Sequence, residues 1–316
     1  MAWTTTELLA DIRRRARLST TDPDHTDANL LLDADSVMDE VIVPLVLIAR
    51  SDYYTRHEDQ SIVAEQQTYP IPSRAVASVP RQVFWVDGSG TYRELAYLTL
   101  ADSLGFNDSG EPEAYTIRDN EVWLLPTPST ASGSLRIAYE YQPGKLVLPS
   151  ACAVVEGVDR TTGTLDCTDV PTTWTNATIL DIVKGTSPFV LLAADLDPTT
   201  VTTGASGSVD FVATDLPDAS RLPSSATGDY ICPAGYSCIP QIPADLHSLL
   251  ALGVAVEVLD QVGDPLANLM RQKLGQALTA AQRKLSPRVK GSPQKIVSRN
   301  SPLRRGRRAR WSVSVP

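Results

Sequence analysis

Hydrophobic residues follow a helical spacing at both ends of this chain and a strand-like alternation between them, and this order constrains the fold more than any other feature. Residues 28–55 and 264–285 each carry an apolar stripe at three- and four-residue spacing, and residues 243–261 are apolar on nearly every side. Because such helices are not stable alone in water, we expect the two terminal groups of helices to pack together.

The helix boundaries carry sequence signals of their own. Thr4 and Glu7 form the Thr-x-x-Glu pattern of a capping box, which predicts the start of the first helix. Pro44 should kink the helix over residues 28–55, because proline has no backbone N–H. Asp264 should cap the last helix.

Four arginines close the first predicted helix: Arg13, Arg14, Arg15 and Arg17. Cations are favourable at the C-terminal end of a helix dipole, so a solvated helix end is the simplest interpretation. A contact with a neighbouring subunit or with nucleic acid is the alternative.

The middle of the chain shows alternating apolar residues separated by tight turns. Leu135, Ile137 and Tyr139 occupy alternate positions of one predicted strand. Asp119 and Asn120 form a dipeptide that favours a hairpin turn before it. Three aromatic residues also lie on predicted strands, where inward packing is favoured over a face that stacks on sugars or bases; they are Trp85, Trp123 and Tyr139.

Together these patterns predict an α+β fold. We expect a helical bundle built from the N- and C-terminal helices, with projecting antiparallel β-domains and an extended basic C-terminal arm. The expected domains are the N-terminal helices of the bundle at 1–60, an antiparallel β-domain at 61–150, a second β-rich module (a small barrel or sandwich) at 151–240, a helix pair that completes the bundle at 241–286, and the basic arm at 287–316.

Positive charge is concentrated at the C-terminal end. The chain has a formal net charge of −9, yet from Arg283 onward it contains 11 Lys and Arg residues and no acidic residue. The first 282 residues therefore carry a formal charge of −20. Such a division indicates that the basic end has its own partner, although a solvated tail and a nucleic-acid contact are alternatives.

The candidate partner-binding residues of this arm are its arginines and the alternating apolar residues that follow them. The alternation is typical of a strand that is added to the sheet of another subunit. These residues are Arg299, Arg304, Arg305, Arg307, Arg308, Arg310, Trp311, Val313 and Val315.

No pattern in the sequence indicates catalysis. The chain contains no GxSxG, Walker, HExxH or GxGxxG motif, so we expect neither enzymatic activity nor a cofactor. Its four cysteines lack the Cys-x-x-Cys spacing of a zinc site, and we expect ordinary thiols and no metal. Cys232 and Cys238 are close enough to form a disulfide in an oxidising compartment.

Nothing in the sequence indicates a membrane partner. The first residues lack the apolar core of a signal peptide, and the longest apolar run, residues 41–49, is nine residues long and contains a proline. We therefore expect a soluble protein made in a cytoplasm.

A pattern of prolines and tyrosines runs through residues 110–146, GEPEAYTIRDNEVWLLPTPSTASGSLRIAYEYQPGKL. It consists of a Pro-x-x-Tyr strand, a strand that ends in Pro-x-Pro, and a strand that ends in Tyr followed by Pro-Gly: Pro112, Tyr115, Pro126, Pro128, Tyr139, Pro143 and Gly144. This pattern resembles the head-to-tail adaptors of tailed bacteriophages, also called connector, neck or head-completion proteins. The segments TELLADIRRRARL, YPIPSRAV, GDYICPAG and IPADLHSLLALGVAVEVLDQVGDP resemble their counterparts, whereas residues 151–239 resemble them least.

The resemblance implies a structural protein of the virion neck, present in the host cytoplasm during assembly. Such adaptors form rings, commonly of twelve subunits, that extend the DNA channel beneath the portal and provide a docking surface for the tail. The implied partners are the portal protein, tail or nozzle proteins, further copies of the chain, and genomic DNA that passes without specific recognition. The basic arm would then clip onto an acidic portal surface. The alternative function is that of a tail-associated receptor- or glycan-binding protein.

Overall fold

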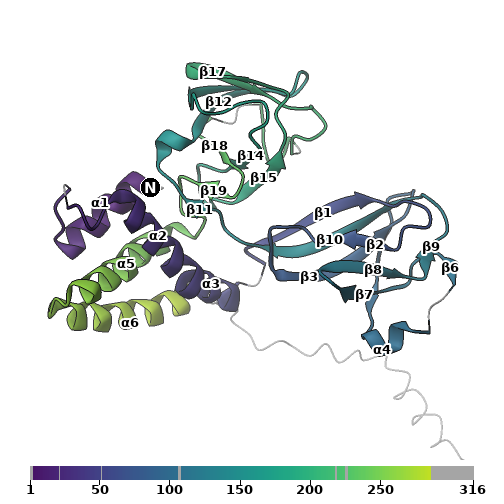
Figure 1. Ribbon diagram of the computed structural model, residues 1–316, viewed down its shortest axis with the longest axis horizontal. Helices are drawn as coiled ribbons and strands as arrows, with labels where there is room; N and C mark the ends of the chain where they lie inside the picture. Colours follow the sequence, from purple (N-terminus) through teal and green to yellow (C-terminus); the bar gives the residue numbers. More distant parts are fainter. Residues whose placement is uncertain are drawn as a thin grey trace, which may run out of the picture.

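The protein consists of a helical layer and two β units, which lie around a common junction (Figure 1). The computed structural model describes residues 3–20, 22–50, 52–105, 108–217, 219–224 and 227–285. The helical layer combines the N-terminal helices with the last two helices, and the β units follow one another between them.

The helical layer is built around α5. This helix is buried on almost every side, as its sequence predicts, and it contacts α1, α2 and α6. The elements of the layer are α1 (Thr5–Ala16), α2 (Asp27–Val37), the π-helical turn η1 (Met38–Ile42), α3 (Val43–Ala49), the 3₁₀ turn η3 (Ala244–Leu246), α5 (His247–Val262) and α6 (Leu266–Leu285).

The ends of the helices follow the predicted signals, but the second helix is shorter than expected. Thr4 and Glu7 form the capping box of α1, and the side chain of Asp264 accepts a hydrogen bond from the N–H of Leu266. The helix predicted over residues 28–55 is interrupted by η1, which ends two positions before Pro44, and its last helical residue is Ala49.

The first β unit contains two four-stranded sheets, ordered β1-β10-β3-β4 and β2-β8-β7-β5, and a two-stranded sheet, β6-β9. Buried residues of both larger sheets belong to one apolar cluster. Its elements are β1 (Thr55–Ser61), β2 (Thr68–Pro70), β3 (Ala75–Val86), β4 (Tyr92–Glu94), β5 (Ala96–Tyr97), α4 (Leu100–Ser103), β6 (Ser109–Gly110), β7 (Ala114–Arg118), β8 (Glu121–Leu125), β9 (Thr127–Pro128) and β10 (Ser134–Tyr141).

Strand β10 lies at the centre of its sheet, between β1 and β3. Leu135, Ile137 and Tyr139 point into the core, which confirms their predicted alternation. The turn between β7 and β8 is the predicted hairpin, since Asp119 and Asn120 both have positive φ angles.

The second β unit is a seven-stranded antiparallel sheet with its own apolar core. Its order is β15-β14-β18-β12-β13-β17-β16, and among the described residues the two edge strands form no ladder with each other, so the sheet is an open half-barrel. Its strands are β12 (Ala153–Asp159), β13 (Thr164–Val170), β14 (Leu180–Val183), β15 (Leu191–Leu196), β16 (Thr200–Thr202), β17 (Gly204–Asp210) and β18 (Tyr230–Pro233).

The chain enters and leaves the second β unit at the same place. The incoming segment carries β11 (Lys145–Leu146) and the 3₁₀ turn η2 (Pro149–Ala151), and the outgoing segment carries β19 (Tyr236–Ser237). Strands β11 and β19 pair in parallel, and both lie at the junction of the three parts (Figure 1).

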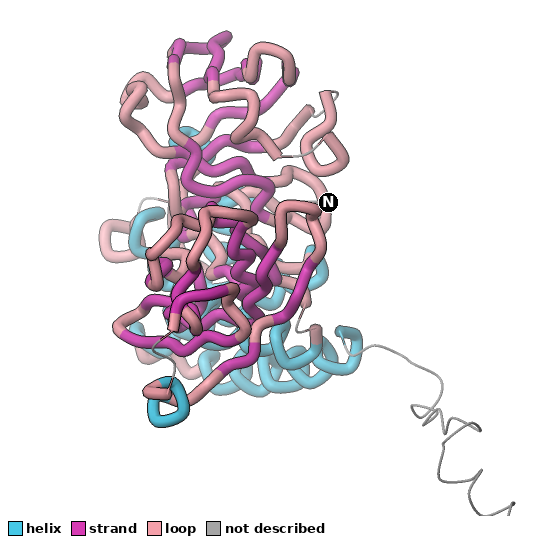
Figure 2. The backbone as a smooth tube through the Cα atoms, turned by 90° about the vertical axis from the view of Figure 1, so that its right-hand side faces the viewer, coloured by secondary structure: helices cyan, strands magenta, loops and turns pink. Residues whose placement is uncertain are grey.

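The predicted fold, a helical bundle with projecting β-domains, is wrong. The described chain is built mostly from strands in five sheets, with short helices at one side, and strands run through most of the molecule (Figure 2). The helices also lack a core of their own, since their buried side chains form one cluster with those of the first β unit. Tyr54 and Tyr141, both fully buried, stack edge to face where the helices and that unit meet. The apolar stripes correctly indicated buried helix faces, but they did not show that a sheet covers part of that core.

Candidate functional site

The residues predicted to bind a partner lie outside the described part of the chain. The last described residue is Leu285, at the end of α6. The predicted arm residues beyond it are Arg299, Arg304, Arg305, Arg307, Arg308, Arg310, Trp311, Val313 and Val315.

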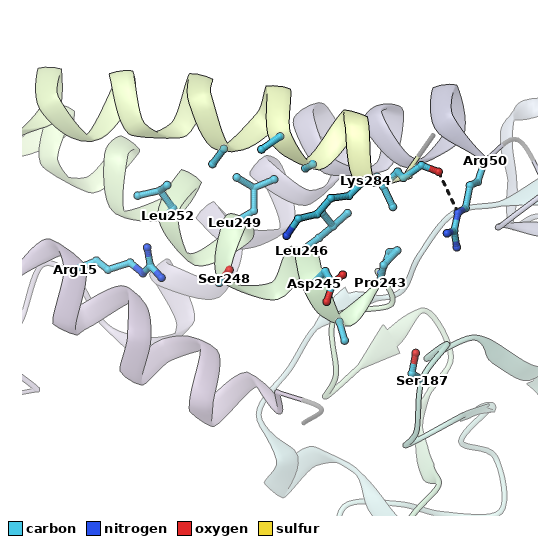
Figure 3. A pocket seen from close by; sticks show the side chains of 15 residues that line it. Arg15, Arg50, Ser187, Pro243, Asp245, Leu246, Ser248, Leu249, Leu252 and Lys284 are labelled. Atoms are coloured by element: carbon cyan, nitrogen blue, oxygen red, sulfur yellow. Dashed lines mark hydrogen bonds between the residues drawn. The ribbon is translucent and has the colours of Figure 1, made fainter. Parts of the chain in front are cut away.

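A pocket of about 450 Å³ lies beside the end of α6 and is lined by Leu285 itself (Figure 3). The pocket opens between α1, α5 and α6, with Ser187 of the second β unit at one side. The small side chains of Ala277, Ala280 and Ala281 leave room for it on α6. On the same helix, Met270, Leu274 and Leu278 pack against the core, which confirms the predicted apolar stripe.

The charged residues of this pocket are mostly cationic. Arg15, Arg50 and Lys284 line it together with one carboxylate, Asp245 (Figure 3). Arg50 is held in place because its Nε donates a hydrogen bond to the carbonyl oxygen of Leu285, at 3.4 Å. Three cations beside apolar walls suit a carboxylate carried by an apolar segment of another protein.

The arginines of α1 largely contact groups of the same chain. Arg13 is buried, and its guanidinium contacts Asp27 at 2.7 Å and the carbonyl oxygens of Ser19 and His25. The carboxylate of Asp11 pairs with Arg14 and with Arg15, the latter at 2.7 Å. The simple interpretation, a solvated helix end, is therefore wrong for Arg13, which has a structural role.

Carboxylates gather on the helical layer, where α2, η1 and α5 lie side by side. Burial raises the pKa of Glu257, and the nearby charges of Asp33, Glu40 and Asp260 raise it further. Burial likewise raises the pKa of Asp33 and of Asp39. We call the carboxylates around Glu257 the acidic face: Asp33, Glu40, Glu257 and Asp260.

One sequence feature indicates part of this surface. In the apolar run of α5, Glu257 and Asp260 are the two acidic residues, so they mark the solvent-facing side of that helix. Their proximity to α2 could not be inferred, because it depends on how the two helices pack.

Asp35 lies on the side of α2 that faces β11. Burial raises its pKa to about 6, and the charge of Asp39 raises it further. The N–H of Leu146 donates a hydrogen bond to the carboxylate of Asp35 at 2.8 Å, and this bond lowers the pKa. The folded state therefore holds this proton more tightly than the unfolded state does. The contribution of protonated Asp35 to the stability of the folded state is complete below the ordinary pKa of 3.8. This contribution is lost as the pH rises through about 6.

Replacing Asp35 with asparagine should therefore stabilise the protein at pH 7 to 8 and have little effect at pH 3 to 4. We expect a gain of about 1 kcal/mol, allowing for the solvent screening of a half-buried group. The amide oxygen of asparagine can still accept the hydrogen bond from Leu146. Urea denaturation of both proteins across this pH range measures the difference. If Asp35→Asn changed the free energy of unfolding equally at all pH values, the raised pKa of Asp35 would be contradicted.

Two of the three aromatic residues on the predicted strands pack inward, and the third, Trp123, does not. Trp85 and Tyr139 are buried in the first β unit. Trp123 is half-buried, and the guanidinium of Arg118 lies over its ring, 4.8 Å from the centroid. The two buried rings are therefore part of the core, and the third is covered by an arginine of the same chain.

Comparison with known proteins assigns the chain to a family. The family model for the SU10 adaptor protein matches residues 4–183, which is more than half of the chain. No match was found among curated proteins. In the described residues, no helix is both long and apolar enough to cross a membrane. The match spans α1 to α3, the first β unit and the first strands of the second unit. The chain belongs to the SU10 adaptor protein family and is a structural adaptor protein of a bacteriophage virion.

Proposed function

We propose that this protein is a head-to-tail adaptor that forms a ring beneath the portal, extends the DNA channel and receives the tail. The observation that carries the proposal is the division of charge within a phage adaptor: −20 over the first 282 residues, and 11 cations without an acidic residue from Arg283 onward. An acidic body and a cationic end suit two different neighbours. The role is structural and requires no catalysis.

Surfaces of opposite charge on the helical layer support a ring of identical subunits. The cationic pocket contains Arg15, Arg50 and Lys284, and the acidic face contains Glu257 and Asp33. In a closed ring, each subunit presents one surface to the complementary surface of the next, and twelve copies would match a dodecameric portal. Pairing between such surfaces would set the orientation of neighbouring subunits.

The negative body also suits a channel through which DNA slides. A protein binds the DNA backbone when its cations neutralise phosphates and release counterions. A wall whose carboxylates outnumber its cations does the opposite and keeps the phosphates from adhering. Genomic DNA would therefore pass without specific recognition.

The basic arm would clip the ring onto the portal. Its arginines would pair with portal carboxylates, and the alternating side chains Trp311, Val313 and Val315 would add a strand to a portal sheet. The β units would face the tail or nozzle proteins.

Deletion of residues 287–316 should leave a folded subunit that no longer joins portal-containing heads. The buried apolar residues of the described part of the chain extend to Leu285, and the deletion removes none of them. Circular dichroism checks the fold, and sedimentation of truncated protein mixed with purified heads checks joining. Symmetric reconstruction of the neck would show the ring and its position.

Two partial variants separate the arm's contributions. One replaces Arg304, Arg305, Arg307, Arg308 and Arg310 with glutamine, and the other replaces Trp311, Val313 and Val315 with serine. We expect both variants to weaken the joining of the protein to heads. High salt should weaken joining by the wild type as the arginine variant does, because salt screens charge pairs. The variant without the apolar side chains should not show this resemblance. Normal joining by the full truncation would refute the role of the arm.

The alternative, a tail-associated receptor- or glycan-binding protein, receives little support from the second β unit. Stacking on sugars requires exposed aromatic rings. In that unit Trp174, Phe189 and Phe211 are buried, and Tyr236 is the most exposed aromatic side chain among its described residues.

A further inference from the structure

Three cysteines converge at the junction where the chain enters and leaves the second β unit. Cys152 precedes β12, Cys232 lies on β18, and Cys238 follows β19. Each is at most 1% exposed, and their three sulfur atoms all lie within 4.8 Å of one another. Cys152 is 80 residues from Cys232 in sequence, so only the fold brings it beside the other two cysteines.

This cluster joins the second β unit to the rest of the protein. The N–H of Thr5, at the start of α1, donates a hydrogen bond to the carbonyl oxygen of Cys238 at 2.9 Å. The hydroxyl of the same residue donates to the carbonyl oxygen of Val147 at 2.7 Å, on the segment that leads to Cys152. A bond among the three sulfurs therefore fixes the incoming segment, the outgoing segment and the helical layer at one point.

A disulfide accounts for two of the three sulfurs. Cys152 and Cys232 form a disulfide, with their Cα atoms 4.5 Å apart, and Cys238 is a free thiol. The third sulfur lies beside this disulfide and takes no part in it.

Cys167 shows what an isolated buried thiol looks like in this protein. It lies in the core of the second β unit, apart from the cluster, and its Sγ contacts the carbonyl oxygen of Leu165 at 3.4 Å. It is buried like the three clustered cysteines, but among the residues that the structure describes it belongs to no group of possible metal ligands.

We propose that in the reduced protein Cys152, Cys232 and Cys238 bind one Zn²⁺ ion, and that the disulfide is the competing oxidised state. Zinc–thiolate bonds of about 2.3 Å in tetrahedral geometry place sulfur atoms about 3.8 Å apart. The observed spacing, within 4.8 Å, needs only small movements to reach that arrangement. A phage protein is synthesised in a host cytoplasm, where thiols remain reduced.

The two states are connected by balanced steps. Two molecules of a low-molecular-weight thiol reduce the Cys152–Cys232 disulfide to two cysteine thiols and leave as their own disulfide. The three cysteine thiols then release three protons and donate three sulfur ligands to Zn²⁺. Among the described residues no further His, Cys, Asp or Glu belongs to the group, so a water molecule takes the fourth position.

The test uses the full-length protein, reduced and freed of metal, titrated with Zn²⁺ alone in a calorimeter. We expect one equivalent to bind, and saturating Zn²⁺ at about a hundredfold excess over Kd to raise the unfolding midpoint by about 4 °C. Titration with Cd²⁺ should produce the ultraviolet charge-transfer band of cadmium–thiolate bonds. Cys238→Ser should lose most of the affinity, whereas Cys167→Ser, the matched control, should bind like the wild type.

The wild-type chain provides a second comparison that does not depend on a folded variant. Oxidised protein, with the Cys152–Cys232 disulfide verified by peptide mapping, should bind no Zn²⁺, and reduction should restore binding. Absence of stoichiometric binding to the reduced chain would overturn the proposal. Equal binding by the oxidised and reduced chains would also overturn it, since two of the proposed ligands are unavailable in the oxidised state.

Discussion

Replacing Arg74 with alanine should destabilise the protein by about 3–5 kcal/mol, because it leaves a buried carboxylate without its cation. Arg74 lies in the turn between β2 and β3, and its Nη2 contacts Oδ2 of Asp181 on β14 at 2.5 Å. Asp181 is only 1% exposed and also accepts hydrogen bonds from the N–H groups of Asp195 and Gly235, both at 2.9 Å. The ion pair therefore connects the two β units.

The pH dependence of this effect identifies its cause. Burial raises the pKa of Asp181 even with Arg74 beside it, and loss of the cation should raise the pKa further. The cost of Arg74→Ala should thus be largest at neutral pH and shrink as the pH falls and Asp181 becomes protonated. Urea denaturation at several pH values gives this profile.

Two further variants control for the loss of side-chain contacts. Arg93 pairs with Glu111 at 3.0 Å on the exposed surface, so Arg93→Ala should cost less than about 1 kcal/mol. Combining Arg74→Met with Asp181→Asn removes both charges and keeps an acceptor for one of the two N–H groups. This double variant should be more stable than Arg74→Ala. A cost for Arg74→Ala as small as that of Arg93→Ala would contradict the assigned role of the pair.

Sequence patterns predicted the features that depend on neighbouring residues. The capping box of Thr4 and Glu7, the turn at Asp119 and Asn120, and the buried character of α5 all follow from residues within a few positions of each other. Strand β1 was missed because its sequence, TRHEDQS, is polar and shows no alternation. It forms a strand because β10 supplies a paired edge along its whole length.

Features that depend on distant residues could not be predicted. The shared core of helices and first β unit, which corrects the predicted fold, brings together residues such as Tyr54 and Tyr141. The acidic face likewise combines α2 with α5, which are separated by the whole of both β units. The cysteine cluster is similar, because the spacing of Cys152 from Cys232 indicates neither a disulfide nor a metal site. In each case the sequence identified the type of residue but not its partner.

Replacing Gly253 with leucine should destabilise the protein by about 3 kcal/mol or more through overpacking between α5 and α2. A Cβ atom at this position would lie 2.6 Å from Cγ1 of Val37 on α2. Val37 is buried, and a β-branched side chain has little freedom at χ1 to move away. The contact of α2 with α5 therefore depends on the missing side chain.

Alanine at the same position tests the balance of two opposing effects. Gly253→Ala gains about 1 kcal/mol of helix propensity but suffers the clash with Val37, so we expect net destabilisation. Gly275→Ala on α6 is the matched control, since a Cβ there meets no atom within 4 Å, and it should stabilise the protein by about 1 kcal/mol. Val37→Ala combined with Gly253→Ala removes the clashing methyl group and should cost less than the sum of the single changes, as measured by urea denaturation. Strict additivity of the two substitutions would show that the helices do not meet at this glycine.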